Sequence, residues 1–90
     1  MSKIKISVTK NDIRMGRPFR SQVCPVARAI RLHFIAQGVF VHDLCVSSLA
    51  AVFYTDHVRH VVNLPRSVYR FVTRYDAGKS VKPFNFIVEM

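Results

Sequence analysis

Residues 64–86 read LPRSVYRFVTRYDAGKSVKPFNF, and this stretch predicts a helix followed by a strand. The helix starts at Pro65, because proline is favoured in the first turn, and Asp76-Ala77-Gly78 ends it. The strand follows Pro83 and places alternate side chains on one face. The apolar face of the helix follows the i, i+3, i+4, i+7 pattern and consists of Val68, Phe71, Val72 and Tyr75. The matching face of the strand consists of Phe84, Phe86 and Val88.

The N-terminal residues predict a strand and a short helical turn. Residues 3–8 alternate lysine or serine with isoleucine or valine, as a half-buried strand with a basic outer face does. Thr9 and Asp12 have the spacing of a capping box. We therefore expect residues 10–15 to form one helical turn that stops at Gly16.

A longer helix is expected after a loop at residues 16–23. Cys24-Pro25 opens it, and Gly38 is its natural end. Its apolar stripe consists of Val26, Ala27, Ile30 and Phe34.

The middle of the chain is rich in β-branched and aromatic residues and predicts three short strands in a meander. The turns are expected near residues 47–48 and 56–57, although residues 48–51 fit a helical turn as well. The three strands are residues 39–46, 49–55 and 57–64. The predicted fold is α+β, with two helices packed on one face of a mainly antiparallel sheet and the order β-α-β-β-β-α-β.

Composition restricts the class of protein. The chain has 90 residues, so residues 1–90 are expected to form a single small domain. Half of the residues are hydrophobic, which excludes a disordered chain, and no apolar run reaches the length of a membrane span. The N-terminus lacks the apolar stretch of a secretory signal, and two cysteines are too few for a disulfide scaffold. These features predict a basic cytosolic domain.

Positive charge is the main functional signal. The formal net charge is +9, and nine of the 14 basic residues are arginines, whose guanidinium groups bind phosphate or carboxylate through a planar fork. One set recurs every four residues along the C-terminal helix and consists of Arg66, Arg70 and Arg74. A second set consists of Lys10, Arg14, Arg17, Arg20, Arg28 and Arg31. Both sets predict a surface for phosphates or an acidic protein, and the alternative is a solvated charged face.

Aromatic side chains between the arginines bear on the same question. Phe19 lies between Arg17 and Arg20, and Tyr69 precedes Arg70. Either could stack on a nucleobase if it were exposed, whereas Phe19 could equally plug the core. The aromatic strand motif of RNA-binding modules and the Cys/His spacing of zinc fingers are absent from the sequence.

Metal binding and catalysis receive little support. His42, Cys45, His57 and His60 have ligand types that suit zinc, but residues three apart on a strand are expected to face opposite sides. We therefore expect scattered histidines and no metal or other cofactor. Cys24 could be an activated nucleophile at a helix N-terminus, although an inward-facing cysteine is the simpler interpretation. No catalytic motif is present, so we expect no enzyme and no small-molecule substrate.

Three segments together resemble small proteins encoded by phages and mobile elements. They are IxVTxxDI at residues 6–13, CPVA at residues 24–27, and LPxxVxxFVxxYDxGxxVxPFxF at residues 64–86. The resemblance implies a shared fold and a phage-like origin, but it covers neither residues 39–63 nor any catalytic residue.

Such phage proteins include anti-CRISPR inhibitors, which act by binding in the host bacterial cytoplasm. Many of them are acidic DNA mimics, and this chain departs from that type. The resemblance therefore implies a basic inhibitor of a CRISPR effector ribonucleoprotein that contacts guide RNA or an acidic patch of a Cas protein. The alternatives are an accessory protein that binds DNA or RNA directly, and an assembly protein of the virion.

Overall fold

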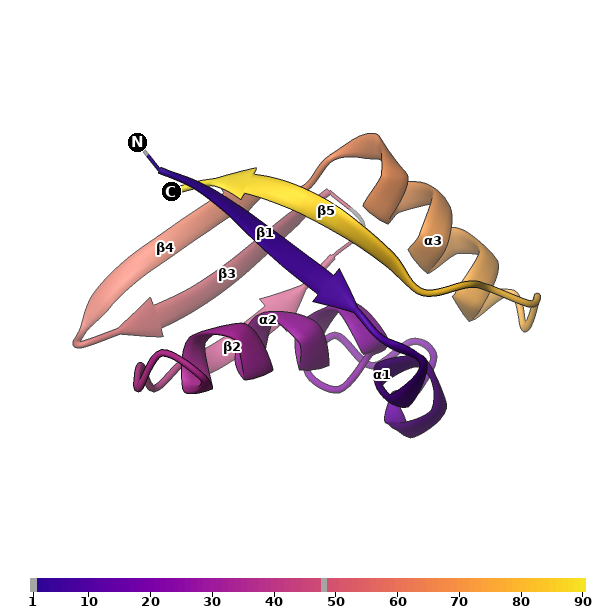
Figure 1. The fold of residues 1–90 in the computed structure, drawn as a ribbon, viewed down its shortest axis with the longest axis horizontal. Coiled ribbons are helices and arrows are strands. Elements are labelled where there is room, and N and C mark those ends of the chain that lie inside the picture. Colours follow the sequence, from indigo (N-terminus) through magenta and orange to yellow (C-terminus); the bar gives the residue numbers. More distant parts are fainter. Residues whose placement is uncertain (1, 48) are drawn as a thin grey trace.

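The computed structural model describes residues 2–47 and 49–90 and confirms the predicted α+β class and order of elements (Figure 1). The short capped turn at Lys10–Met15 forms a helix of its own, so two helices follow the first strand. None of the helices in the described residues is long and apolar enough to cross a membrane. The elements are β1 (Lys3–Val8), α1 (Lys10–Met15), α2 (Pro25–Ile35), β2 (His42–Val46), β3 (Ala50–Thr55), β4 (Val58–Asn63), α3 (Arg66–Asp76) and β5 (Phe84–Glu89).

The strands divide into two antiparallel sheets instead of the single sheet that the sequence suggested. One is the pair β1–β5, and the other is the meander β2-β3-β4. Figure 1 shows β1 and β5 running across the direction of β3 and β4. Strands that cross in this way cannot align their N–H and C=O groups into a ladder, so β4 and β5 are neighbours without sheet pairing.

Both sheets and two of the helices contribute to one hydrophobic core. The side chains of Ile6, Val26, Phe53 and Val68, from β1, α2, β3 and α3, are almost completely buried there. Helix α2 buries one whole face, whereas α3 buries only Val68 and Phe71. Most of the surface of α3 therefore stays accessible.

The helices α2 and α3 end as predicted, near Gly38 and Gly78. Both glycines have a φ of +75°, a conformation that glycine adopts without steric strain. The N–H of the following residue donates to a carbonyl five residues back: Val39 to Phe34 at 2.9 Å, and Lys79 to Arg74 at 3.0 Å. This is the Schellman arrangement that terminates a helix.

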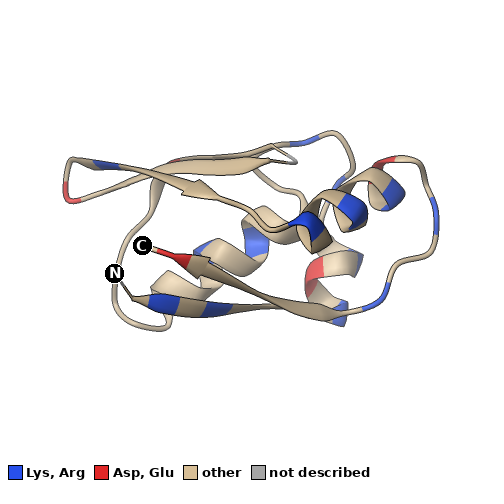
Figure 2. Ribbon diagram, turned by 90° about the horizontal axis from the view of Figure 1, so that it is seen from above, with Lys and Arg blue, Asp and Glu red and all other residues tan. Residues whose placement is uncertain are grey.

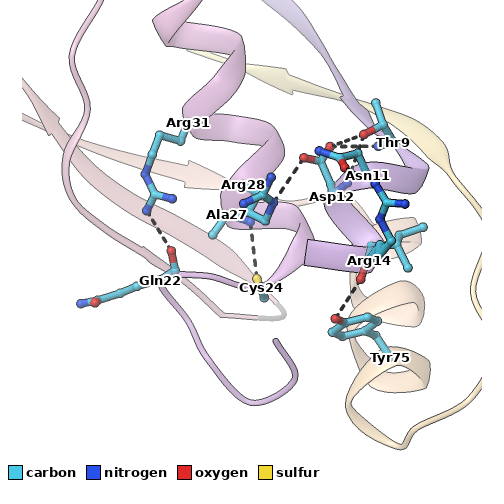
Figure 3. A network of polar contacts seen from close by, with 11 residues as sticks. Thr9, Asn11, Asp12, Arg14, Gln22, Cys24, Ala27, Arg28, Arg31 and Tyr75 are labelled. Carbon is cyan, nitrogen blue, oxygen red and sulfur yellow. Dashed lines mark hydrogen bonds and ion pairs between the residues drawn. The ribbon is translucent and has the colours of Figure 1, made fainter. Parts of the chain in front are cut away.

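The predicted capping box joins α1 to α2. Asp12 is 1% exposed, and its Oδ2 accepts hydrogen bonds from the backbone N–H and the hydroxyl of Thr9, both at 2.9 Å. Its Oδ1 lies 3.7 Å from Nε of Arg28 on α2 (Figure 3). Gly16 follows α1 at a point where a Cβ would lie only 2.7 Å from Cδ of Pro25. Close packing of the two helices therefore explains this glycine, since its φ of −73° is ordinary.

Of the two predicted turns, the one at Asp56-His57 is confirmed. Both residues have positive φ, 47° and 66°, as a two-residue type I′ hairpin requires. The other turn includes Ser48, which lies outside the described residues. Ala50 and Ala51 belong to β3, so the helical alternative for this stretch is wrong at these two positions.

Candidate functional site

The arginine column of α3 is present as predicted. Arg66, Arg70 and Arg74 are all exposed, whereas the buried residues of the helix are Val68 and Phe71. Four residues advance a helix by about 6 Å and rotate it by about 40°, so the guanidinium groups follow one gently turning line. Arg74 donates to the carbonyl oxygen of Ser80 at 3.2 Å. Among the described residues, no carboxylate forms an ion pair with any of the three.

The second predicted set divides into exposed and internally engaged arginines. Arg28 pairs with the buried Asp12, and its side chain is 26% exposed. Arg31 is half-buried and donates to the carbonyl oxygen of Gln22 at 2.8 Å (Figure 3). These two arginines hold the fold together, so they offer a partner less than the exposed ones do. The exposed members of the predicted site, which we call the basic surface, are Arg14, Arg17, Arg20, Arg66, Arg70 and Arg74.

Three exposed lysines border the basic surface, and of these only Lys10 belongs to a basic set that was predicted from the sequence. Lys10 lies on α1, while Lys79 and Lys82 lie on the segment between α3 and β5. Figure 2 shows that blue segments gather at the end of the molecule formed by α1, α3 and this connection. Lysines in a loop show no periodic signal, and only the fold brings them to the arginines.

Phe19 is exposed and does not plug the core. Its side chain is 78% exposed, and its backbone has a positive φ of 58°. A non-glycine residue in this conformation costs about 1–3 kcal/mol, and leaving a phenylalanine in water forgoes about 1.5–3 kcal/mol of burial. Both effects disfavour this arrangement of Phe19 in the folded state, so folding stability does not account for the exposed ring.

Hydrogen bonds hold the Phe19 loop to two other parts of the fold. The N–H of Phe19 donates to Oδ1 of Asp76, at the end of α3, over 3.0 Å. The N–H of Val46 on β2 donates to the carbonyl oxygen of Ser21 over 2.9 Å. The loop closes on itself through the N–H of Arg17, which donates to the carbonyl oxygen of Val23. The exposed ring is therefore attached to a fixed backbone.

Phe19 and Tyr69 line the same cleft, which we call the aromatic cleft. It has a volume of about 400 Å³ and lies between the loop, the end of β2 and one side of α3. Tyr69 is 46% exposed. By helical geometry, Tyr69 lies about 60° around α3 from Arg66, and Thr73 lies about 60° from Arg70. The lining residues are Phe19, Arg20, Ser21, Cys24, Val46, Ser47, Tyr69, Val72, Thr73 and Asp76.

The other side of the arginine column borders a second groove. Arg70, Arg74 and Lys82 stand at its edge, and the aromatic rings of Phe71 and Phe84 contribute to its apolar lining. The centroids of these two rings are 4.8 Å apart, so they belong to the packing between α3 and β5. The arginine column is thus a ridge with a depression on either side.

The expectation that His42 and Cys45 face opposite sides of their strand is wrong. The register of β2 with β3 shifts between them, at a β-bulge where Asp43 has a φ of 52°. Cys45 pairs with Val52 and His42 with Tyr54, and alternate residues of β3 share a face. The bulge therefore returns both side chains to the exposed face.

The four residues whose side chains would suit zinc, His42, Cys45, His57 and His60, nevertheless do not converge on one point. His60 lies on the inner side of β4, where its ring stacks on Phe53 and a hydrogen bond of 2.6 Å joins Nε2 to the hydroxyl of Thr55. His57 lies in the hairpin turn and lines a cleft with His42. Within residues 2–47 and 49–90, no three His, Cys, Asp or Glu side chains are placed to hold a metal ion.

Cys24 faces inward and caps α2. It is 7% exposed, and its Sγ accepts a hydrogen bond from the N–H of Ala27 at 3.4 Å (Figure 3). Burial raises the pKa of the thiol above its ordinary value of 9.0 and outweighs the hydrogen bonds that would lower it. A nucleophilic cysteine needs the opposite shift, because the thiolate is the reactive form.

Comparisons with protein-family models, with curated proteins and with solved structures return no match to this chain. The candidate site is therefore interpreted from its own geometry and charge.

Proposed function

We propose that this protein binds a nucleic acid without catalysing a reaction on it, and that the backbone phosphates lie along the arginine column of α3. The observation that carries the proposal is the line of Arg66, Arg70 and Arg74, in which like charges repeat and no described carboxylate forms an ion pair with them. Such pairs oppose folding by a few tenths of a kcal/mol each, so an external anion accounts for them better than stability does. The regular spacing of about 6 Å suits the regularly repeated phosphates of a nucleic acid strand better than the irregular carboxylates of a protein surface.

The resemblance to small phage proteins supplies a setting for this binding. In that setting the protein is a counter-defence inhibitor of the anti-CRISPR type, and the strand on α3 is the guide RNA of a bacterial CRISPR effector complex in the host cytoplasm. The alternative is a phage accessory protein that binds DNA or RNA directly. The two differ in what tight binding requires: an assembled complex for the inhibitor, and a free strand for the accessory protein.

A salt titration with two matched variants tests the binding surface. One variant replaces Arg66, Arg70 and Arg74 by glutamine. The control makes the same replacement at Lys3, Lys5 and Arg59, which are exposed on β1 and β4. Both remove three positive charges. For a single-stranded RNA, the slope of log K against log salt should become shallower by about 2 in the α3 variant, because each phosphate contact contributes about 0.7. The control should keep the wild-type slope.

Equal losses in the two variants would mean that net charge alone attracts the nucleic acid, and an unchanged slope in the α3 variant would refute the proposal. A pull-down of tagged protein from nuclease-treated and untreated bacterial lysates then separates the two settings. A Cas complex that survives nuclease supports the inhibitor. Bulk nucleic acid that vanishes on treatment, with no protein left, supports the accessory protein.

A further inference from the structure

We infer that the aromatic cleft is a subsite for one unpaired nucleobase, which stacks on the ring of Phe19. The inference rests on the proposed function and specifies it: the nucleic acid is single-stranded where it crosses α3. Phosphates lie along the arginine column, and one base turns aside into the cleft next to it.

The first support is the way in which Phe19 is presented. Its ring is 78% exposed on a backbone of positive φ, and the N–H of the same residue is fixed by Asp76, 57 positions later in the chain. The loop is also tied to β2 through Ser21. An aromatic ring held in water by several tertiary contacts is preorganised for a flat apolar ligand, and every nucleobase has such a face.

The second support is the chemistry of the cleft lining. Tyr69 offers a second exposed aromatic ring, and Ser21 and Thr73 offer hydroxyl groups. The hydroxyl of Ser47 is already hydrogen-bonded to the backbone of Leu49 and Ala50. Hydroxyls donate and accept hydrogen bonds, so they can pair with the polar edge of any base. Arg20 adds a cation for the phosphate or for the π-face of the base. An aliphatic ligand would leave these polar groups without partners.

The third support is the position of the cleft beside the arginine column. Tyr69 lies about 60° around the axis of α3 from Arg66, and Thr73 lies about 60° from Arg70. A strand can therefore contact both features at once. A duplex cannot present a base face in this way, since stacking covers both faces of each internal base. The surrounding positive charge favours a polyanion over an aromatic side chain of an ordinary protein partner.

Phe19→Ala tests the inference, and Phe40→Ala is its matched control. Phe40 is 76% exposed, but it stacks on His42 and is not part of the cleft. The probe is a fluorescently labelled 12-nucleotide RNA of mixed sequence, offered single-stranded and annealed to its complement. Phe19→Ala should weaken single-strand binding fivefold or more and leave the salt slope and the duplex affinity unchanged. Phe40→Ala should match the wild type.

A second measurement locates the base directly. The chain contains no tryptophan, so Phe19→Trp and Phe40→Trp each introduce a single tryptophan, whose emission can be excited apart from that of the three tyrosines. Single-stranded RNA should quench the emission of the first variant and leave the second unchanged, because only the first tryptophan would stack on a base.

The outcomes separate this inference from the proposed function. Equal affinities of Phe19→Ala, Phe40→Ala and the wild type, together with a shallower salt slope in the α3 arginine variant, would overturn the base subsite and leave the nucleic-acid surface in place. Failure of the wild-type protein to bind either form of RNA, together with failure to retain a Cas complex or nucleic acid in the lysate pull-down, would overturn both. Quenching of Phe19→Trp by polyglutamate as strong as that by RNA would assign the cleft to an acidic protein instead.

Discussion

Replacing Asp76 by alanine should have opposite effects on two contributions to binding, the electrostatic attraction of the nucleic acid and the positioning of Phe19 for base stacking. The substitution removes a negative charge beside the basic surface, which favours a polyanion. It also removes the acceptor for the N–H of Phe19. A model in which charge alone binds nucleic acid predicts tighter binding, whereas the base subsite predicts weaker binding. The sign of the change therefore decides between them.

The magnitudes show which effect should prevail. A unit charge about 10 Å from a phosphate in water contributes at most about 0.4 kcal/mol, and salt at 0.1 M screens most of it, so the electrostatic gain is less than twofold. The hydrogen bond to Phe19 contributes about 1 kcal/mol, which is comparable to the strain of its positive φ. Without this bond the loop can relax, and part of the about 1–3 kcal/mol of base stacking is lost. We expect Asp76→Ala to bind single-stranded RNA threefold to tenfold more weakly than the wild type.

Fluorescence anisotropy with the labelled RNA measures this change, and two controls isolate its cause. Asp76→Asn keeps a side-chain oxygen for the N–H of Phe19 but loses the charge, so it should bind as tightly as the wild type or slightly more tightly. Glu89→Ala loses a charge on β5, outside the aromatic cleft, and should behave in the same way. If Asp76→Ala bound RNA as tightly as Asp76→Asn, the proposed role of Asp76 in positioning Phe19 would be refuted.

Further predictions concern stability and thiol chemistry. Gly16→Ala should lower the free energy of unfolding by about 1–2 kcal/mol in a thermal or urea melt, because the new Cβ must displace backbone atoms at the α1–α2 junction; an unchanged melting temperature would contradict this packing. Asp12→Ala should destabilise by about 2 kcal/mol, since it removes the cap of α1 and the partner of Arg28, and a loss no larger than that of an ordinary surface substitution would count against it. The raised pKa of Cys24 means that the unfolded chain loses this proton first as pH rises, so stability should fall above about pH 9 and fall less in Cys24→Ser; identical alkaline pH profiles of the two proteins would be the opposing result. In the native protein iodoacetamide should modify the exposed Cys45 and spare Cys24, which mass spectrometry of the labelled peptides would show.

Local sequence signals predicted the elements of this fold well. The capping box at Thr9 and Asp12, the helix ends at Gly38 and Gly78, and the hairpin turn at Asp56 all depend on neighbours within a few residues. The arginine column was equally predictable, because helical periodicity alone aligns its members.

Features that depend on distant contacts were not predictable. The sequence marks Asp76 only as the end of a helix, and nothing local shows that it holds Phe19. Arg28 looked like an open cation because its partner Asp12 lies on a different helix. The bulge at Asp43 places His42 and Cys45 on the same face of β2, although regular strand alternation predicts opposite faces. The residue with positive φ in this bulge is not a glycine, so there is no local sign of it in the sequence. The split into two sheets likewise depends on how strands cross in space, which periodicity does not encode.

The pairing of β1 with β5 has a consequence for how the chain is made. Ser2 and Met90 exchange two backbone hydrogen bonds of 3.0 Å, so these two residues lie side by side (Figure 1). During synthesis, the first strand leaves the ribosome long before the only strand that pairs with it in the described structure. Until β5 emerges, the apolar face of β1 and much of the core around α2 remain open. The β1–β5 pair can therefore form only after β5 is translated, and the apolar surface that is exposed until then favours aggregation.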